Sequence, residues 1–415
     1  MRFYITLEKR QVVKMLKYEI KKVFSKARCK IALLFLMIVL LAVSMMTISR
    51  VEYVDENGNH TTGFGAAKTL REEKNKWAGS LTEDTLRNVY RENQAINSEN
   101  GSGPIEDENR AYQKKQGISS ITELINNANS PWRDYNYYAI DSITEDEAAN
   151  VYEKRVSGLE NWFSSGEETF SQEQQDFLLG QYKSLDTPFY FEYYDGWAAL
   201  LQNISTFILM LALFIGFFVS GIFSDEFQTK ADAVFFSTKL GRNRAIRVKL
   251  GAGFLIATVL YVAFLFLYTA VVLLILGADG AGCPIQLELW RDFYNATFLE
   301  TYLLIAVGGY IGMLFAATIA MLISALTRST VIAIIAPFVV LCVFPFLSRI
   351  ITLPELCSFF PDRLMDIYNA VQDFSIMQIG GMVIGIPTVI ILVYTIVTLI
   401  LQPVVYGVYK KAEIK

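Results

Sequence analysis

Residues 31–48 read IALLFLMIVLLAVSMMTI, a stretch of 18 residues without one charged side chain. An α-helix needs about 17–25 mostly apolar residues to cross the roughly 30 Å hydrocarbon core of a bilayer. One such stretch could be the core helix of a soluble protein. Six occur in this chain, which predicts a membrane protein: Ile31–Ile48, Ile204–Phe223, Leu250–Ala278, Tyr302–Leu326, Val331–Leu347 and Ile379–Leu401.

The composition supports this prediction, because 53% of the residues are hydrophobic and only 19% are charged, whereas soluble domains have about 25% charged residues. Ala42-Val43-Ser44 resembles a signal-peptide cleavage site. The apolar run is too long and the charged segment before it too extended for a signal peptide, so an uncleaved span is predicted.

The predicted fold class is an all-α membrane protein with six transmembrane helices and an extracellular, mainly helical domain inserted between the first and second.

Charge predicts the orientation, because cytoplasmic segments of membrane proteins are enriched in Lys and Arg. Ten basic and two acidic residues precede Ile31, and the segment 224–249 has six basic and three acidic residues. The segment 50–198 has 14 basic and 27 acidic residues, a net charge of −13. We therefore expect a multi-pass protein of the cell membrane with both termini in the cytoplasm.

The spans and the charges together predict seven parts of the chain. They are a cytoplasmic amphipathic elbow helix (1–30), transmembrane helix 1 (31–49), an extracellular acidic helical domain (50–197), transmembrane helix 2 (198–223), a cytoplasmic loop (224–249), transmembrane helices 3–6 (250–409) and a cytoplasmic tail (410–415).

The extracellular domain shows helix-start signals but no catalytic constellation. Three segments match the Ser-x-x-Glu capping box, namely Ser80–Glu83, Ser120–Glu123 and Ser142–Glu145. The only histidine of the chain is His60, and residues 50–196 contain no cysteine, so neither a His/Cys metal cluster nor a Ser-His-Asp triad is predicted. The domain ends in the aromatic segment 188–197, for which anchoring at the lipid headgroups is expected.

The predicted spans contain no Asp, Glu, Lys, Arg or His, which argues against a proton-driven transporter. Gly308-x-x-x-Gly312 and Gly381-x-x-x-Gly385 are expected to allow close helix packing. Four tyrosines could line a pathway or form interhelical hydrogen bonds, and the sequence leaves both roles open: Tyr261, Tyr268, Tyr310 and Tyr394.

Two cysteines, Cys283 and Cys357, fall in segments predicted to lie outside the cell. Extracellular thiols can oxidise, so these two could form a disulfide, and free thiols are the alternative.

Two segments on the predicted cytoplasmic side have an amphipathic pattern. Residues 3–28 have a basic helical pattern with one apolar side, which suits a helix lying in the inner membrane interface. The loop 224–249 begins with Asp225-Glu226-Phe227, continues with an apolar segment around Val234 and ends with basic residues before Lys249. This loop is either an ordinary basic loop or a contact surface for a soluble partner.

Together with six spans, these segments resemble the membrane subunits of export-type (type-2) ABC transporters, permeases whose ATPase is often a separate chain. In that family a coupling helix between spans two and three begins with an acidic residue, and a Ser/Thr-x-x-x-Arg-like turn and a Lys follow. Glu226, the segment Ser237–Arg242 and Lys249 stand at matching places, with Gln228-Thr229-Lys230 in place of the usual glycine. A large domain between spans one and two is similar to the bacterial sodium/drug-export and ABCA-like branch.

The resemblance implies a permease subunit of an ATP-driven exporter that is not itself an enzyme. No phosphate-binding loop occurs in the sequence, so the chain is expected to bind no cofactor and ATP is expected on the partner ATPase. A homodimer or a second permease would complete the pathway in the lipid bilayer, and no nucleic acid is expected as a partner. The alternative function is a non-transporting sensor or assembly protein that binds through its extracellular domain. The resemblance assigns coupling to the ATPase to Glu226, Val234, Phe235, Phe236, Arg242 and Lys249.

Overall fold

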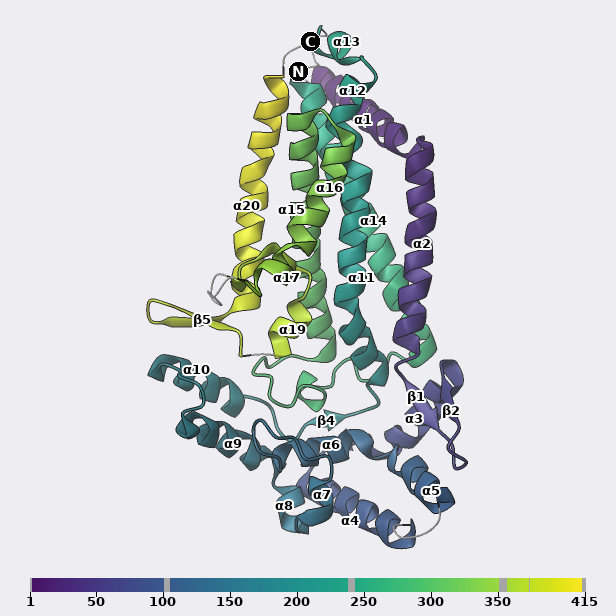
Figure 1. The fold of residues 1–415 in the computed structure, drawn as a ribbon, viewed down its shortest axis with the longest axis vertical. Coiled ribbons are helices and arrows are strands. Elements are labelled where there is room, and N and C mark those ends of the chain that lie inside the picture. The colour runs from purple at the N-terminus through teal and green to yellow at the C-terminus, as the bar shows by residue number, and fades with distance from the viewer. Residues whose placement is uncertain (1, 101–104, 238–242, 351–356, 373, 413–415) are drawn as a thin grey trace.

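The structure is a computed structural model that describes residues 2–100, 105–237, 243–350, 357–372 and 374–412. Among these residues, five helices are long and apolar enough to cross a membrane. They lie side by side in one bundle (Figure 1), so the chain is a mostly helical membrane protein. The five are α2 (Ala27–Ile48), the continuous pair α11 (Asp195–Val219) and α12 (Gly221–Gln228), α14 (Arg244–Leu276), α15 (Phe298–Thr327) and α20 (Ile386–Lys410).

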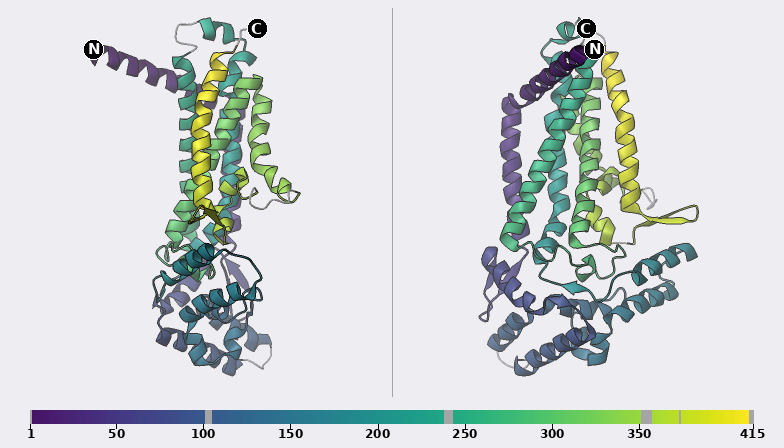
Figure 2. Two further views of the ribbon diagram at one scale, coloured as in Figure 1. Left: turned by 90° about the vertical axis from the view of Figure 1, so that its left-hand side faces the viewer. Right: turned by 180° about the vertical axis from the view of Figure 1, so that it is seen from behind.

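Helix α11 is the centre of the bundle. In its most apolar stretch 67% of the residues are buried, against 22% in α20. It packs against α2, α14, α15 and the shorter α16 (Thr330–Cys342). A glycine makes the last contact possible, because a Cβ on Gly216 would lie 2.7 Å from Cγ of Pro337. The peripheral helices, seen from two further sides in Figure 2, keep apolar side chains on their outer surfaces.

The run 331–347, expected as the fifth span, is not one long helix. It is divided into α16, of 13 residues, and the short α17 (Phe344–Leu347). At 1.5 Å per residue, α16 measures about 20 Å, less than the hydrocarbon core. Pro345 lies at the start of α17, where its missing N–H removes the hydrogen bond that would continue α16.

The run 379–401, expected as the last span, begins with a hairpin instead of a helix. Strands β5 (Ile376–Ile379) and β6 (Met382–Gly385) pair in antiparallel register, and α20 starts only at Ile386. Gly380, with a φ of 63°, and Gly381 form the two-residue turn. The Gly381-x-x-x-Gly385 pair therefore serves no helix contact, and the expectation of helix packing at that site was wrong.

The N-terminal segment is helical, as its pattern predicted. Helix α1 (Arg2–Phe24) lies obliquely to the bundle and bends into α2 at residues 25–26 (Figures 1 and 2). It lies at the same end of the bundle as the last turn of α20, and we call this end the terminal end. The opposite end, where residues 50–197 lie, is called the domain end.

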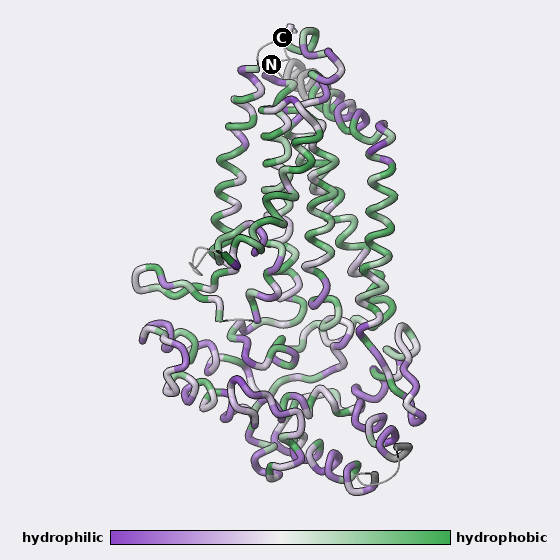
Figure 3. Tube along the Cα trace, in the orientation of Figure 1, coloured by the Kyte–Doolittle hydropathy of each residue, from purple (hydrophilic) through white to green (hydrophobic). Residues whose placement is uncertain are grey.

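Residues 50–197, here called the inserted domain, form a separate polar layer of mostly short helices beyond the domain end (Figure 3). The elements are β1 (Glu52–Val54), β2 (His60–Thr62), α3 (Phe64–Lys74), η1 (Asn75–Trp77), β3 (Gly79–Ser80), α4 (Glu83–Asn100), α5 (Ile105–Lys115), α6 (Ser119–Ala128), α7 (Ala139–Ser142), α8 (Glu145–Ala149), α9 (Val151–Ser165), α10 (Gln172–Lys183) and β4 (Tyr190–Phe191). The remaining short elements of the chain are α13 (Asp232–Ser237), η2 (Ile285–Leu287), η3 (Pro361–Leu364) and α19 (Ile367–Gln372). Strands pair as β1–β2 and β3–β4, both antiparallel.

Capping boxes occur in the inserted domain, but not at the predicted serines. Helix α8 is capped by Thr144, whose side chain and that of Glu147 satisfy each other's backbone N–H groups. Helix α10 is capped in the same way by Ser171 and Gln174. The segment Ser142–Glu147 contains two overlapping matches to the motif, and the helix begins at the second.

The aromatic segment 188–197 faces protein rather than headgroups, contrary to the expectation. Phe191, Tyr193 and Tyr194 are almost completely buried. The hydroxyl of Tyr193 donates to the carbonyl of Leu276 at 2.9 Å, and that of Tyr194 donates to the carbonyl of Leu287 at 3.1 Å. These bonds connect the inserted domain to the end of α14 and to the loop that follows it.

Candidate functional sites at the two ends of the bundle

A buried group of charges lies at the terminal end, where α12 continues α11. Glu226 of α12 is almost fully buried, and Lys249 of α14 is 0% exposed. The ammonium of Lys249 donates to Glu226 Oε1 at 2.7 Å, to Glu19 Oε2 at 3.0 Å and to the carbonyl of Ile222 at 3.1 Å. Removing a charge from water is costly unless it is paired, and here the pairing joins α1, α12 and α14.

Residues of the α1–α2 junction complete this group. Lys22 donates to Glu226 at 2.5 Å, and Lys26 and Arg28 both pair with Asp225. Burial alone would lower the pKa of Lys22, but the bond to Glu226 and the nearby carboxylates raise it overall. We call the seven residues the terminal ion cluster: Glu19, Lys22, Lys26, Arg28, Asp225, Glu226 and Lys249.

The next element, α13, has one face toward the protein and one toward solvent. Phe236 is buried and its ring lies 5.3 Å from that of Tyr409, a fully buried side chain of α20. Phe235 is half-buried, with its ring 6.0 Å from that of Tyr409. Val234 is 70% exposed. Helix α13 thus contacts the last turn of α20 through its aromatic side chains.

The six residues to which the resemblance assigned coupling therefore occupy different environments. Glu226 and Lys249 are internal ion partners, Phe236 is a buried packing residue, and Val234 is available at the surface. Arg242 lies outside the described residues.

The four tyrosines proposed for a pathway all have hydrogen-bond partners on other segments. Tyr261 donates to the carbonyl of Ala306 at 2.7 Å, and Tyr394 donates to the carbonyl of Phe359 at 2.8 Å. The hydroxyl of Tyr268 bonds that of Thr47 at 2.7 Å, and the hydroxyl of Tyr310 bonds that of Thr258 at 2.9 Å. The contacts of Tyr261, Tyr268 and Tyr310 join two helices, which is one of the two roles that the sequence had left open, and Tyr394 joins α20 to the turn that contains Phe359.

Cys283 and Cys357 are both free and buried, so no disulfide joins them in the structure. Burial raises the pKa of the Cys283 thiol to about 12. The sulfur of Cys283 lies 3.9 Å from the carbonyl oxygen of Glu192.

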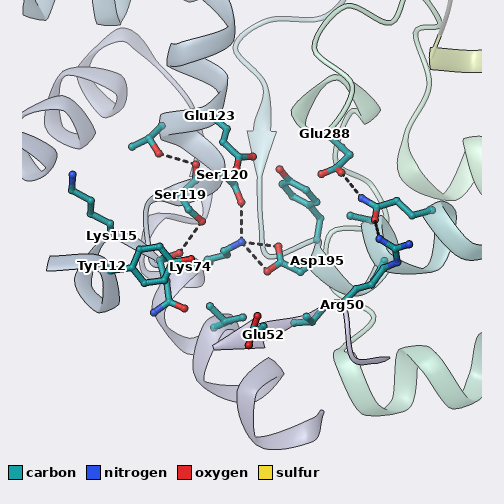
Figure 4. A pocket seen from close by; sticks show the side chains of 18 residues that line it. Arg50, Glu52, Lys74, Tyr112, Lys115, Ser119, Ser120, Glu123, Asp195 and Glu288 are labelled. Atoms are coloured by element: carbon teal, nitrogen blue, oxygen red, sulfur yellow. Dashed lines mark hydrogen bonds and ion pairs between the residues drawn. The ribbon is translucent and has the colours of Figure 1, made fainter. Parts of the chain in front are cut away.

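A cavity of about 340 Å³ lies at the domain end, between the inserted domain and the first turns of α11 (Figure 4). Its most buried charged group is Lys74 of α3. The ammonium of Lys74 donates to both carboxylate oxygens of Asp195 at 2.8 Å and to the hydroxyl of Ser120 at 3.0 Å. The lining residues are Arg50, Val51, Glu52, Leu70, Lys74, Tyr112, Lys115, Gln116, Ser119, Ser120, Thr122, Glu123, Tyr194, Asp195, Ala198, Ala199, Gln202 and Glu288.

Two carboxyl groups in this cavity form no ion pair within the described part of the chain. Glu288 accepts a hydrogen bond from Gln202 at 2.9 Å, and Glu123 borders the cavity from α6. Burial, together with the charge of Glu123, raises the pKa of Glu288 to about 7. Glu123 is solvent-exposed at the edge of the cavity, and partial desolvation by the surrounding protein raises the pKa of its carboxyl group as well. The cavity therefore offers carboxyl groups that an incoming cation would help to ionise.

The loop that holds Glu288 is attached to the inserted domain by Arg155 of α9. The buried guanidinium donates to the carbonyls of Trp290 at 3.1 Å and Asp292 at 2.6 Å, and it lies 3.7 Å from the centre of the Tyr182 ring. Burial raises the pKa of the Asp292 carboxyl to about 7. Arg155 thus positions one wall of the cavity.

The raised pKa of Glu288 predicts a pH-dependent stability. The folded protein binds this proton up to about pH 7, whereas an unfolded glutamate loses it near 4.5, so ionisation of Glu288 costs stability as the pH rises between these values. Glu288→Gln keeps an acceptor for Gln202 without the charge. At pH 8 we expect the variant to be more stable than the unmodified protein by at most about 3 kcal/mol, and at pH 4.5 we expect no difference.

Thermal unfolding midpoints in detergent across this pH range test the prediction. Ionisation of Asp292 also lowers the stability as the pH rises, and it does so in both proteins. The quantity to compare is therefore the difference between the unfolding midpoints of the variant and the unmodified protein at each pH. Glu160→Gln, on an exposed side chain of α9, serves as the control. A difference that does not change with pH would contradict the prediction.

Within the part of the chain that the structure describes, no three His, Cys, Asp or Glu side chains are grouped as ligands for a metal ion. No protein-family model, curated protein or solved structure matches this chain.

The cavity residues were missed by the sequence-based predictions. Lys74 and Asp195 are 121 positions apart, and Gln202 and Glu288 are 86 positions apart. Neither spacing corresponds to a helix or strand period, and the residues meet only because the inserted domain folds back onto α11. Nothing in the sequence around Lys74 indicated that this lysine would be buried in a cavity.

Proposed function

We propose that the chain is the permease subunit of an ATP-driven exporter whose ATPase is a separate protein that docks on α13. The observation that carries the proposal is the position of α13 at the tip of the terminal end (Figure 1). It exposes Val234 outward, while Phe236 contacts α20 on its inner side. Movement of α13 would thus be transmitted to α20 directly.

The terminal ion cluster supports the same function. Glu226 lies only a few residues before α13 and is bonded to Lys22 of α1 and Lys249 of α14. A docked partner that shifts α12 and α13 would therefore also displace α1 and α14. Two discrete arrangements of such packed helices are the usual basis of an alternating-access transition.

The membrane topology that goes with this proposal has six crossings. Helices α16 and α17 together form the fifth. The basic terminal end lies in the cytoplasm, by the excess of Lys and Arg there, and the acidic inserted domain lies outside the cell. A second copy or a related permease completes the pathway, and ATP is bound by the partner.

Docking is tested by Val234→Asp. A charge at the centre of an apolar contact costs about 2 kcal/mol or more, so recovery of a soluble ATPase with the tagged chain should fall by about tenfold or more. Val234→Ile should retain it. Tyr138→Asp, at a side chain that is 72% exposed in the inserted domain, is the control for an added surface charge.

Two outcomes would overturn the proposal. Equal recovery of the ATPase with Val234→Asp and the unmodified chain would remove α13 as the docking element. Absence of any copurifying ATPase would favour a second function, a membrane sensor, for which the cavity at the domain end is the specific observation. Two of its carboxyl groups, Glu123 and Glu288, form no ion pair with any described residue and suit a ligand with an amino or guanidino group.

A further inference from the structure

The β5–β6 hairpin projects sideways from the first turn of α20, between the bundle and α10 (Figure 1). Its sequence, IMQIGGMVIG, contains one polar side chain, Gln378. Residues that pair across an antiparallel hairpin share a face, and successive residues alternate between faces. The observed register therefore divides the hairpin into two faces of different composition.

One face is turned toward the inserted domain. It contains Ile376, Gln378, Val383 and Gly385. Gln378 accepts a hydrogen bond from the hydroxyl of Ser171, the cap of α10, at 2.8 Å. Ile376 packs on the aromatic cluster that includes Trp162.

The other face is entirely apolar and is turned away from the inserted domain. Its cross-strand pairs are Met377 with Ile384 and Ile379 with Met382. Ile379 is 54% exposed and Met382 is 63% exposed, both beside the turn. The hairpin thus uses its one polar side chain on the domain side and leaves large apolar side chains exposed on the other.

This apolar face is continuous with the outer surface of α20. Strand β6 leads directly into α20, whose exposed side chains include Leu392, Ile396 and Leu399. A helix that crosses a bilayer presents such side chains to the lipid acyl chains. The two surfaces meet at the level where the bundle ends and the polar inserted domain begins (Figure 3).

We propose that the apolar face of the β5–β6 hairpin lies on the outer leaflet of the bilayer, with Ile379 and Met382 inserted among the lipid acyl chains. The depth is shallow, because both edges of a two-stranded sheet carry unpaired N–H and C=O groups that the hydrocarbon core cannot satisfy. The backbone therefore lies among the hydrated headgroups. The hairpin holds α10, and with it the inserted domain, against the membrane surface.

Met382→Trp tests the proposal in the full-length chain, reconstituted into phosphatidylcholine vesicles. The probe is phosphatidylcholine brominated either near the headgroup end or near the tail end of its acyl chains. The fluorescence that the introduced tryptophan adds should fall by about half or more with the first lipid and by less with the second. Tyr138→Trp, on the inserted domain, is the matched control and should be quenched by neither.

Ile379→Trp repeats the measurement at the residue that pairs with Met382. The same result at both positions would show that the quenching does not come from a distortion caused by the Met382→Trp substitution. Two outcomes overturn the proposal. Quenching by aqueous acrylamide, as for Tyr138→Trp, with none from the brominated lipids would place the face in water. Protection from both acrylamide and lipid would place it against protein, such as a second copy of the chain.

Discussion

Glu226→Ala is expected to lower the free energy of unfolding by about 3 kcal/mol. The substitution removes the carboxylate that accepts bonds from Lys22 and Lys249. Lys249 is 0% exposed, and among the described residues Glu19 is the one charged partner that it keeps. A buried ammonium that loses its shortest ion pair cannot replace it with water, and this explains the size of the effect.

A double-mutant cycle separates the lost pair from other consequences of the substitution. Lys249→Met removes the buried ammonium, so adding it to Glu226→Ala should restore part of the lost stability. Glu160→Ala is the control, since its pair with Lys183 is exposed and should be worth less than about 1 kcal/mol. Unfolding midpoints in detergent, recorded at one scan rate, give the comparison. A double variant less stable than Glu226→Ala alone would contradict the assignment.

Gly196→Ala is expected to disrupt the junction between the inserted domain and the bundle. A Cβ on Gly196 would lie 2.3 Å from the carbonyl oxygen of Gly277, which is backbone and cannot turn aside. The same turn is fixed by Trp197, whose indole N–H donates to the carbonyl of Ala278 at 3.1 Å. Overpacking of this kind lowers the free energy of unfolding by about 1–3 kcal/mol or more. The upper part of that range is expected here, because the added Cβ would collide with a backbone oxygen.

Gly407→Ala is the matched control, because the same change is made on a helix where the new Cβ would have no atom within 4 Å apart from its chain neighbours and the backbone of its own helix. It should be neutral or stabilise the protein by up to about 1 kcal/mol. Limited proteolysis at residues 50–197, together with the unfolding midpoint, reports on the junction. Equal proteolysis rates and equal unfolding midpoints for the two alanine variants would contradict the prediction, because they would show that the start of α11 can move away from Gly277 without loss of stability.

Much of the membrane region could be predicted from the sequence. Apolar length alone identified the segments that form α2, α11, α14 and α15, because a bilayer-spanning helix satisfies its own backbone hydrogen bonds and needs only apolar side chains. The predictions were wrong where local breakers compete with apolar length. Pro345 separates α17 from α16, and Gly380-Gly381 forms a hairpin turn.

The candidate sites were predicted less completely. Glu226 and Lys249 were assigned to coupling with the ATPase, which stays a prediction, but the internal cluster that their side chains form with α1 was not predicted. Burial of an individual side chain depends on which helices meet, and a pattern in one segment does not contain that information. Val234 alone of the predicted coupling residues is largely exposed among those described.

The sequence by itself determined that this protein is a helical membrane protein with a polar insertion after its first long apolar helix, since both properties depend on composition along one segment. The tertiary structure decided which charges are paired, where a cavity opens and which face of the hairpin remains apolar and uncovered. Those features arise between segments far apart in the chain, as with Lys74 and Asp195. The free energy of such contacts depends on close approach and on the exclusion of water, which only the packed structure specifies.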